Sequence, residues 1–350
     1  MSLRGLLAIL PLVLAAQAPP DCWKLKNRGR VADATSCFLK LSTSADPAVR
    51  AEGFWGVRNF EAAKAQFEAA VKAKPQNAAV RVRYGRMFLD RYNNAEAGQL
   101  FREAQGLAPQ SAEATLGLAL VASDGFDKMA TTLARKALQQ DPKLTEAQEL
   151  LAKLAVEDGD FALARQEADR ALQIDPEALT AMAVHASVDL LEDKPSTPWF
   201  DRAYAIHPKF GDGHALAAHF LVINRRYEEG IAQYRKAVEL DPQHFEAWSE
   251  LGINLMRLAR EAEARRCLEI AYNNGWRDAK TVNGLRLIDS YSNFATFRYD
   301  RFTLRVHKKE ADLLKPYLEE QMRKILATYD RKYGFTLKEH VQVEVYPNHD

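Results

Sequence analysis

The sequence predicts a mainly α-helical solenoid of about seven helical hairpins, preceded by a partial hairpin and followed by a small α/β fragment. Two observations predict the stack. A proline recurs at nearly constant intervals, and small and large apolar residues recur at fixed distances before it. A change to alternating polar and apolar residues near residue 300 predicts the α/β fragment. Together these patterns favour a linear array over one compact core, which suits a chain of 350 residues.

The N-terminus has the three parts of an export signal. Arg4 supplies a positive charge, residues 6–16 are apolar, and the Ala-Gln-Ala sequence at 16–18 resembles a cleavage site. The alternative is a retained membrane anchor, but an apolar run this short, interrupted by Pro11, does not span a bilayer. We therefore expect residues 1–18 to be a signal peptide and the protein to be secreted or periplasmic. No later stretch is apolar enough to be transmembrane.

The three cysteines separate into a close pair and a single residue. Cys22 and Cys37 lie in helix-like sequence on either side of a turn, and export would permit a disulfide between them. The alternative is two buried thiols in a helical core. Cys267 falls at a helix position that we expect to be buried, where it serves as inert packing.

Regularly spaced prolines indicate the repeat. A proline cannot donate a backbone hydrogen bond and disfavours helix in the residue before it, so each one ends a helix and begins a turn. Their spacings are 34, 33, 34, 32 and 34 residues. The prolines are Pro75, Pro109, Pro142, Pro176, Pro208 and Pro242.

Small residues recur in phase with the prolines. Ala97, Phe101 and Ala104 precede one proline at the same distances at which Ala63, Phe67 and Ala70 precede another. The small residues allow two helices to approach closely, and the aromatic ring fills the space between neighbouring hairpins. The clearest copy, residues 245–275, contains Trp248, Leu251, Gly252, Ala264, Leu268 and Ala271.

This pattern resembles the tetratricopeptide repeat (TPR) family, whose repeat of about 34 residues reads W-x2-L-G-x2-Y…A-x3-F…P. The resemblance covers residues 22–275 and implies a right-handed TPR-type solenoid in which each hairpin is stabilised by its neighbours. The copy that ends at Pro208 is degenerate. Pro195, Ser196 and Pro198 replace its usual turn and alanine, so we expect a short second helix there.

The first helix of each hairpin should line the concave face of such a stack. A groove there could take an extended peptide or a helix, partly through positive side chains. The alternative is that these side chains are ordinary solvated charges. No Lys/Asn/Arg clamp for a terminal carboxylate is recognisable, so the protein or peptide partner stays unidentified. The residues predicted on this face are Arg83, Arg86, Lys153, His219 and Arg257.

The repeat ends near residue 276. Residues 276–298 are expected to form a capping helix and linker. Residues 299–350 predict a half-buried strand with Phe302, Leu304 and Val306 on one face, a helix with Pro316 in its first turn, and a second strand over 341–345. Strand, helix and strand begin an α/β domain, which we expect to be truncated.

This C-terminal segment resembles the start of a peptidase MA-like (gluzincin) metallopeptidase domain. The similar sequences are Phe-Thr-Leu-Arg-Val-His, Tyr-Gly-Phe and Val-Glu-Val-Tyr-Pro. The resemblance implies zinc held by an H-E-x-x-H helix and a later glutamate, with the helix glutamate activating water. No pair of histidines here fits that motif, and His214 and His219 point to different sides of a helix. We expect no catalytic residue, metal ligand or cofactor in this chain, although zinc is possible in a longer parent protein.

Composition excludes some functions. The 48 basic and 47 acidic residues leave a net charge of +1, which argues against a nucleic-acid binder. Three hypotheses remain: an exported scaffold that binds protein or substrate through its concave surface, the substrate-recruiting part of a zinc metallopeptidase, and a structural envelope assembly factor. Whether the parent protein is an enzyme is left open.

Overall fold

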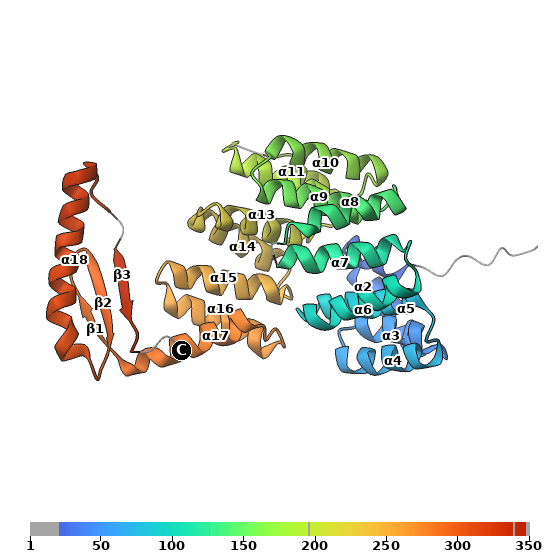
Figure 1. Cartoon of the computed structure of the whole chain (residues 1–350), viewed down its shortest axis with the longest axis horizontal. Coiled ribbons are helices and arrows are strands. Elements are labelled where there is room, and N and C mark those ends of the chain that lie inside the picture. Colours follow the sequence, from blue (N-terminus) through green and yellow to red (C-terminus); the bar gives the residue numbers. More distant parts are fainter. Residues whose placement is uncertain (1–20, 126, 195–196, 339, 348–350) are drawn as a thin grey trace, which may run out of the picture. The chain divides into compact units, whose positions relative to one another are not determined.

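The computed structural model describes residues 21–125, 127–194, 197–338 and 340–347. The predicted signal peptide lies outside these residues. The chain divides into two compact units: residues up to 147 with 205–208, and residues 148–204 with 209 onward. Most of it is helical, and the helices pair into successive hairpins (Figure 1). The predicted fold class is therefore confirmed.

The first unit contains four hairpins. Each joins a first helix to a second helix that packs against it. The helices are α1 (Cys22–Asn27), α2 (Val31–Leu41), α3 (Pro47–Gly56), α4 (Phe60–Ala73), α5 (Ala78–Leu89), α6 (Asn94–Leu107), α7 (Ala112–Asp124) and α8 (Met129–Gln140). Helix α9 (Thr145–Glu157) begins in this unit and continues in the second.

The second unit continues the array and ends in a sheet. After α9 its helices are α10 (Phe161–Ile174), α11 (Leu179–Leu191), α12 (Trp199–Ile206, whose last two residues belong to the first unit), α13 (Gly211–Ile223), α14 (Tyr227–Leu240), α15 (Phe245–Arg257), α16 (Glu261–Asn273) and α17 (Ala279–Ser290). The predicted short second helix is α12, which has eight residues where α10 and α14 have 14.

The six prolines lie where the sequence predicted them, between one hairpin and the next. Polar side chains then start many of the helices by accepting hydrogen bonds from free backbone N–H groups. Examples are Asn59, Asn77, Asn93, Ser111 and Asp160. Prolines between the hairpins and polar side chains that cap the helix N-termini thus determine where the helices begin and end.

Turns inside the hairpins share one backbone feature. Most of the turns that join a first helix to its second helix contain a residue with positive φ, whether or not it is glycine; the described residues of the α7–α8 turn contain none. Within the described residues the positive-φ residues of these turns are Gly29, Arg58, Tyr92, Gly159, Asp193, Arg225 and Ala259. The same turn geometry therefore recurs with very different side chains.

Small residues let the helices of each hairpin approach closely, as the sequence predicted. Ala63, Ala97 and Ala264 are completely buried. A Cβ atom on Gly252 would lie 2.7 Å from the Leu268 Cγ atom. Phe101 fills the space between neighbouring hairpins and is also completely buried.

Cys22 and Cys37 are joined as a disulfide in the structure, with Cα atoms 5.6 Å apart. It links α1 to α2 and lies in a small core with Ala34 and Phe38. Cys267 is a buried free thiol whose pKa burial raises to about 11, so it is unreactive near neutral pH.

We expect thiol titration of the unreduced, denatured protein to detect one reactive thiol, Cys267. After reduction the same assay should detect three. A loop of this length stabilises a fold by about 3 kcal/mol, so the reduced chain should also unfold at lower urea concentration. Three reactive thiols without reductant would contradict the disulfide.

The C-terminal sheet has three strands: β1 (Phe294–Arg298), β2 (Phe302–His307) and β3 (Val341–Val345), in the order β1-β2-β3. β1 is antiparallel and β3 parallel to β2, and Phe302 lies opposite Val341. Helix α18 (Ala311–Tyr333) crosses over from β2 to β3 (Figure 1). The sequence analysis missed β1, which follows a short 3₁₀ turn (Tyr291–Asn293) after the capping helix α17.

Two further expectations about this segment were wrong. Strand β2 is buried on both faces rather than half-buried, because Arg305 is enclosed by Glu261, Glu344 and the ring of Tyr291. Pro316 lies in the second turn of α18, since that helix begins at Ala311.

Candidate functional site: the first-helix face

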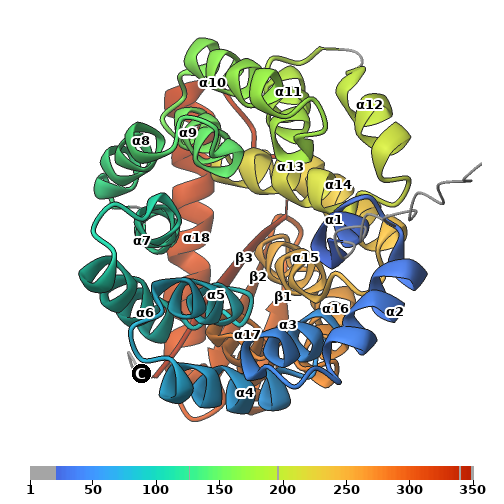
Figure 2. The same cartoon turned by 90° about the vertical axis from the view of Figure 1, so that its right-hand side faces the viewer.

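Within each unit the first helices lie along one side and the second helices along the other. Figure 2 shows α3, α5 and α7 in one row with α4, α6 and α8 outside them, and α9, α13 and α15 similarly inside α10, α14 and α16. We call the sides formed by α1, α3, α5 and α7 in the first unit, and by α9, α11, α13, α15 and α17 in the second, the first-helix face. All five residues that the sequence analysis predicted to bind a partner lie on these helices.

In the first unit this face contains a cluster of two indoles, a guanidinium and a carboxylate. Arg83 forms two hydrogen bonds to Glu52, of 2.7 and 2.8 Å. Its guanidinium carbon also lies over the Trp55 ring, 4.7 Å from the ring centroid, and 5.5 Å from the centroid of the Trp23 ring. Trp23 donates a 2.8 Å hydrogen bond to the same Glu52 carboxylate. Arg83 therefore lies fixed and half-exposed on an aromatic surface.

Electrostatics keep this cluster charged. Burial lowers the pKa of Arg83, but the hydrogen bonds and charge of Glu52 outweigh it, so the net pKa is raised. Nearby, Trp55 donates a 2.8 Å hydrogen bond to Asp90. Burial raises the pKa of the Asp90 carboxyl, against the lowering effect of that bond. Arg83 thus remains a cation at every physiological pH.

Arg86, the second predicted cation, forms a bidentate ion pair with Glu146, and its two guanidinium N–H groups each donate a 2.5 Å hydrogen bond to a carboxylate oxygen. Neither arginine is therefore a free positive charge, and a partner would meet fixed ion pairs. The sequence analysis missed Trp23, Glu52 and Trp55, because the residues of this cluster come from helices about 30 residues apart. In the sequence, the signal for this cluster is a tryptophan on a predicted first helix. Its residues become neighbours through the stacking of the hairpins, which the sequence around each residue does not show.

In the second unit Lys153 and Glu157 lie on α9, and His219 lies on α13. The His219 Nε2 atom is 3.9 Å from the Glu157 carboxylate. Burial raises the pKa of Glu157, which the charge of Lys153 partly offsets. Burial also lowers the pKa of His219, so the imidazole is neutral near pH 7.

Further along this face Lys280, from α17, pairs with Glu250 of α15 at 2.8 Å. Burial raises the pKa of Glu246, which the nearby Glu250 and Asp212 carboxylates reinforce. Arg257, the fifth predicted residue, is exposed, and its guanidinium lies 5.4 Å from the Tyr227 ring centroid. The face in this unit therefore carries charges of both signs.

Among the described residues no three His, Cys, Asp or Glu side chains come together in a way that could hold a metal ion. The described helices also include none that is both long and apolar enough to cross a membrane.

The chain was compared with known proteins. The tetratricopeptide repeat family model matches residues 49–112, 114–178 and 217–279, together more than half of the chain. No curated protein matches the sequence.

Several solved structures resemble the chain in fold. A chain of the APC/C hetero-tetramer Cut9–Hcn1 is 14% identical with a TM-score of 0.48, over 75% of this chain and 54% of that one. PilF of Pseudomonas aeruginosa is 21% identical with a TM-score of 0.38, over 59% and 95%. A thermophilic TPR protein of Thermus thermophilus is 19% identical with a TM-score of 0.42, over 51% and 100%. This chain spans about half the length of the Cut9–Hcn1 chain.

Proposed function

Because the chain belongs to the tetratricopeptide repeat family, we propose that it is an exported scaffold that binds a protein partner through its first-helix face. The observation that carries this proposal is the cluster of Trp23, Glu52, Trp55 and Arg83, in which the Arg83 side chain is 39% exposed and lies over the buried Trp55 ring. Tryptophan and arginine are among the residues most enriched where protein interfaces derive their binding energy. The ion pairs hold these side chains in place before a partner arrives, which reduces the entropy lost on binding.

Export is supported by two features. Residues 1–18 have the composition of a signal peptide. The disulfide between Cys22 and Cys37 suits an oxidising compartment such as the periplasm or the cell exterior. A secreted or periplasmic location therefore remains our proposal.

Photo-cross-linking tests the binding face. A photoreactive amino acid is placed at Lys153 or Arg257 on first helices, and at the exposed Lys236 on the second helix α14 as the matched control. After irradiation of native cells we expect a discrete adduct from the first-helix positions and none from Lys236. Adducts from Lys236 alone, or equally from all three positions, would refute the proposed face.

A second candidate function is favoured by the C-terminal part of the second unit. Ile325 and Tyr329 on α18 are 44% and 53% exposed. Among the described residues no further strand pairs with the outer edge of β3. A larger α/β domain would cover these groups, as in a zinc metallopeptidase whose repeats recruit substrate. Reading the gene beyond codon 350 tests this: an H-E-x-x-H motif would support it, and a stop codon there would exclude it.

A further inference from the structure

Helix α12 is attached to the array differently from the other second helices. It has eight residues where the second helices α10 and α14 have 14. Elsewhere alanines such as Ala164 and Ala168 on α10 bring a second helix close to its neighbours. At α12 the contact is made by aromatic rings on Trp199, Phe200 and Tyr204. Stacked rings therefore add to the completely buried Ala203 in holding α12.

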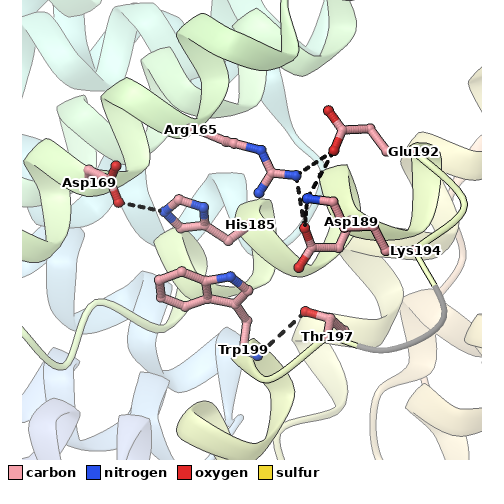
Figure 3. Close-up of polar contacts among 8 residues, drawn as sticks. All are labelled: Arg165, Asp169, His185, Asp189, Glu192, Lys194, Thr197 and Trp199. Atoms are coloured by element: carbon pink, nitrogen blue, oxygen red, sulfur yellow. Dashed lines mark hydrogen bonds and ion pairs between the residues drawn. The ribbon is translucent and has the colours of Figure 1, made fainter.

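Each ring contact involves a buried histidine. The His185 ring on α11 lies face to face with the Trp199 indole, with centroids 4.0 Å apart and planes 7° from parallel (Figure 3). The His214 ring on α13 stacks on Phe200 at 4.1 Å. Both histidines are 3% exposed. Two imidazoles thus form much of the surface on which α12 rests.

The hydrogen bonds of His185 suit a neutral ring. Its Nε2 atom lies 2.9 Å from the Asp169 carboxylate on α10, which requires Nε2 to carry the proton. Its Nδ1 atom is buried and has no hydrogen-bond partner among the described residues. A second proton would therefore create a buried N–H donor without an acceptor, which is costly.

His214 is also arranged as a neutral ring. Its Nδ1 atom lies 2.7 Å from the Gln233 amide oxygen on α14 and donates to it. Its Nε2 atom then accepts a hydrogen bond from the Tyr204 hydroxyl on α12. Protonation of Nε2 would turn this acceptor into a donor, so Tyr204 would lose the partner of its hydroxyl proton.

We propose that α12 is a pH-sensitive latch, which the neutral rings of His185 and His214 keep closed and which their protonation releases. Release would uncover α11, whose residues 181–189 are buried in succession.

Charged groups around the latch act in both directions. For His185, burial is the largest influence and lowers the pKa; Asp169 and Asp189 act against it, and Arg165 acts with it. For His214, burial again lowers the pKa, with Lys236 acting the same way and Gln233 against it. The Arg202 guanidinium, 4.5 Å from the Trp199 ring centroid, adds a further positive charge on α12.

A separate ion-pair group lies at the C-terminal end of α11. The carboxylates of Asp189 and Glu192 each form ion pairs with both Arg165 and Lys194 (Figure 3). Burial raises the pKa of Asp189, but the bonds from Lys194 and Arg165 outweigh it, and the net pKa lies below its ordinary value. These ion pairs therefore persist at pH 5.5.

The sign of the effect follows from the lowered pKa values. In a released latch both histidines return towards their ordinary pKa of 6.5, so the open form binds protons more readily than the closed form. Closure is complete above pH 6.5 and weakens as the pH falls below it. Each histidine can raise the opening equilibrium by up to about tenfold per pH unit.

Hydrogen–deuterium exchange of the full chain tests the proposal. Peptides from α12 and, as internal reference, α14 are compared at pH 7.5 and 5.5 after correction for intrinsic exchange rates. We expect α12 to open more at pH 5.5, by up to about tenfold for each histidine, and α14 to be unchanged. Equal corrected protection of α12 at both pH values, or a matching change in α14, would overturn the latch.

Three variants assign the effect. In the double variant His185→Phe and His214→Phe, which keeps both rings, α12 should stay protected at both pH values. In His219→Phe, the control on the same helix α13, the wild-type pH dependence should remain. The third variant, Asp169→Asn, tests the proposal even if the double variant does not fold. It removes the counter-ion of protonated His185 but keeps a hydrogen-bond acceptor. In this variant α12 should therefore open more than in wild type at pH 5.5. No added opening in Asp169→Asn, or a persisting pH effect in a folded double variant, would refute the assignment.

Discussion

Replacing Gly53 by alanine should destabilise the first unit by about 3 kcal/mol. Gly53 lies on α3, and a Cβ atom there would be 2.6 Å from the Ser42 Cα atom and closer still to the Ser42 amide nitrogen. A side-chain neighbour could rotate away, but here the obstacle is the backbone at the end of α2. The two helices must separate to admit a single methyl group. Urea unfolding followed by circular dichroism measures the loss.

The same substitution at Gly106 is the matched control. Gly106 is exposed within α6, and a Cβ atom there would meet nothing within 4 Å. Alanine is the better helix former, so Gly106→Ala should stabilise by about 0.5–1 kcal/mol. If both variants shifted the midpoint in the same direction, close backbone approach at Gly53 could not be the cause.

Arg305→Met should detach the sheet from the helical array. Arg305 is 8% exposed and bridges Glu261 on α16 to Glu344 on β3, at 2.6 and 2.7 Å, while its guanidinium lies 3.9 Å from the Tyr291 ring centroid. Methionine would leave two carboxylates facing each other without a cation. Removing one partner of a buried ion pair costs about 3–5 kcal/mol. Limited proteolysis should then cut the chain between α16 and β2 faster than it cuts wild type.

Arg301→Met is the control for this prediction. Arg301 also pairs with a carboxylate, Asp330 on α18, at 2.8 Å, but both side chains are about one-third exposed. Solvent screens such a pair, so its loss should change the stability little and leave the proteolysis pattern unchanged. Glu261→Gln combined with Arg305→Met should restore part of the resistance, since it removes one of the two facing charges. Resistance equal to wild type in Arg305→Met alone would show that the anchor lies elsewhere.

The repeat could be predicted because its signals are local. Proline at Pro142 and Pro176 ends a helix through its own covalent structure, and the buried alanines recur at a fixed distance from it. Strand β1 could not be predicted in this way. Phe294–Arg298 is short, and it becomes a strand only through its antiparallel pairing with β2.

The sequence predicted which residues lie on the first helices, but it did not predict the ion pairs that they form there. Arg83 and Arg86 were expected to present positive charge, yet Glu52 and Glu146 bind them. These pairs are 31 and 60 residues apart in sequence, so nothing local to the arginines reveals them. Which residues become neighbours depends on how hairpins stack. The same reason hides the contact between His185 and Trp199 from a reading of the sequence.

The recurring turn geometry has a consequence for how such an array can change over evolution. Arginine, tyrosine, aspartate and alanine all occupy a left-handed conformation at these corners, at a cost of about 1 kcal/mol each relative to glycine. Stacking of the hairpins imposes this conformation regardless of the residue present. The positive-φ positions of these turns therefore accept many residue types, and each substitution there costs a similar, modest amount of folding free energy.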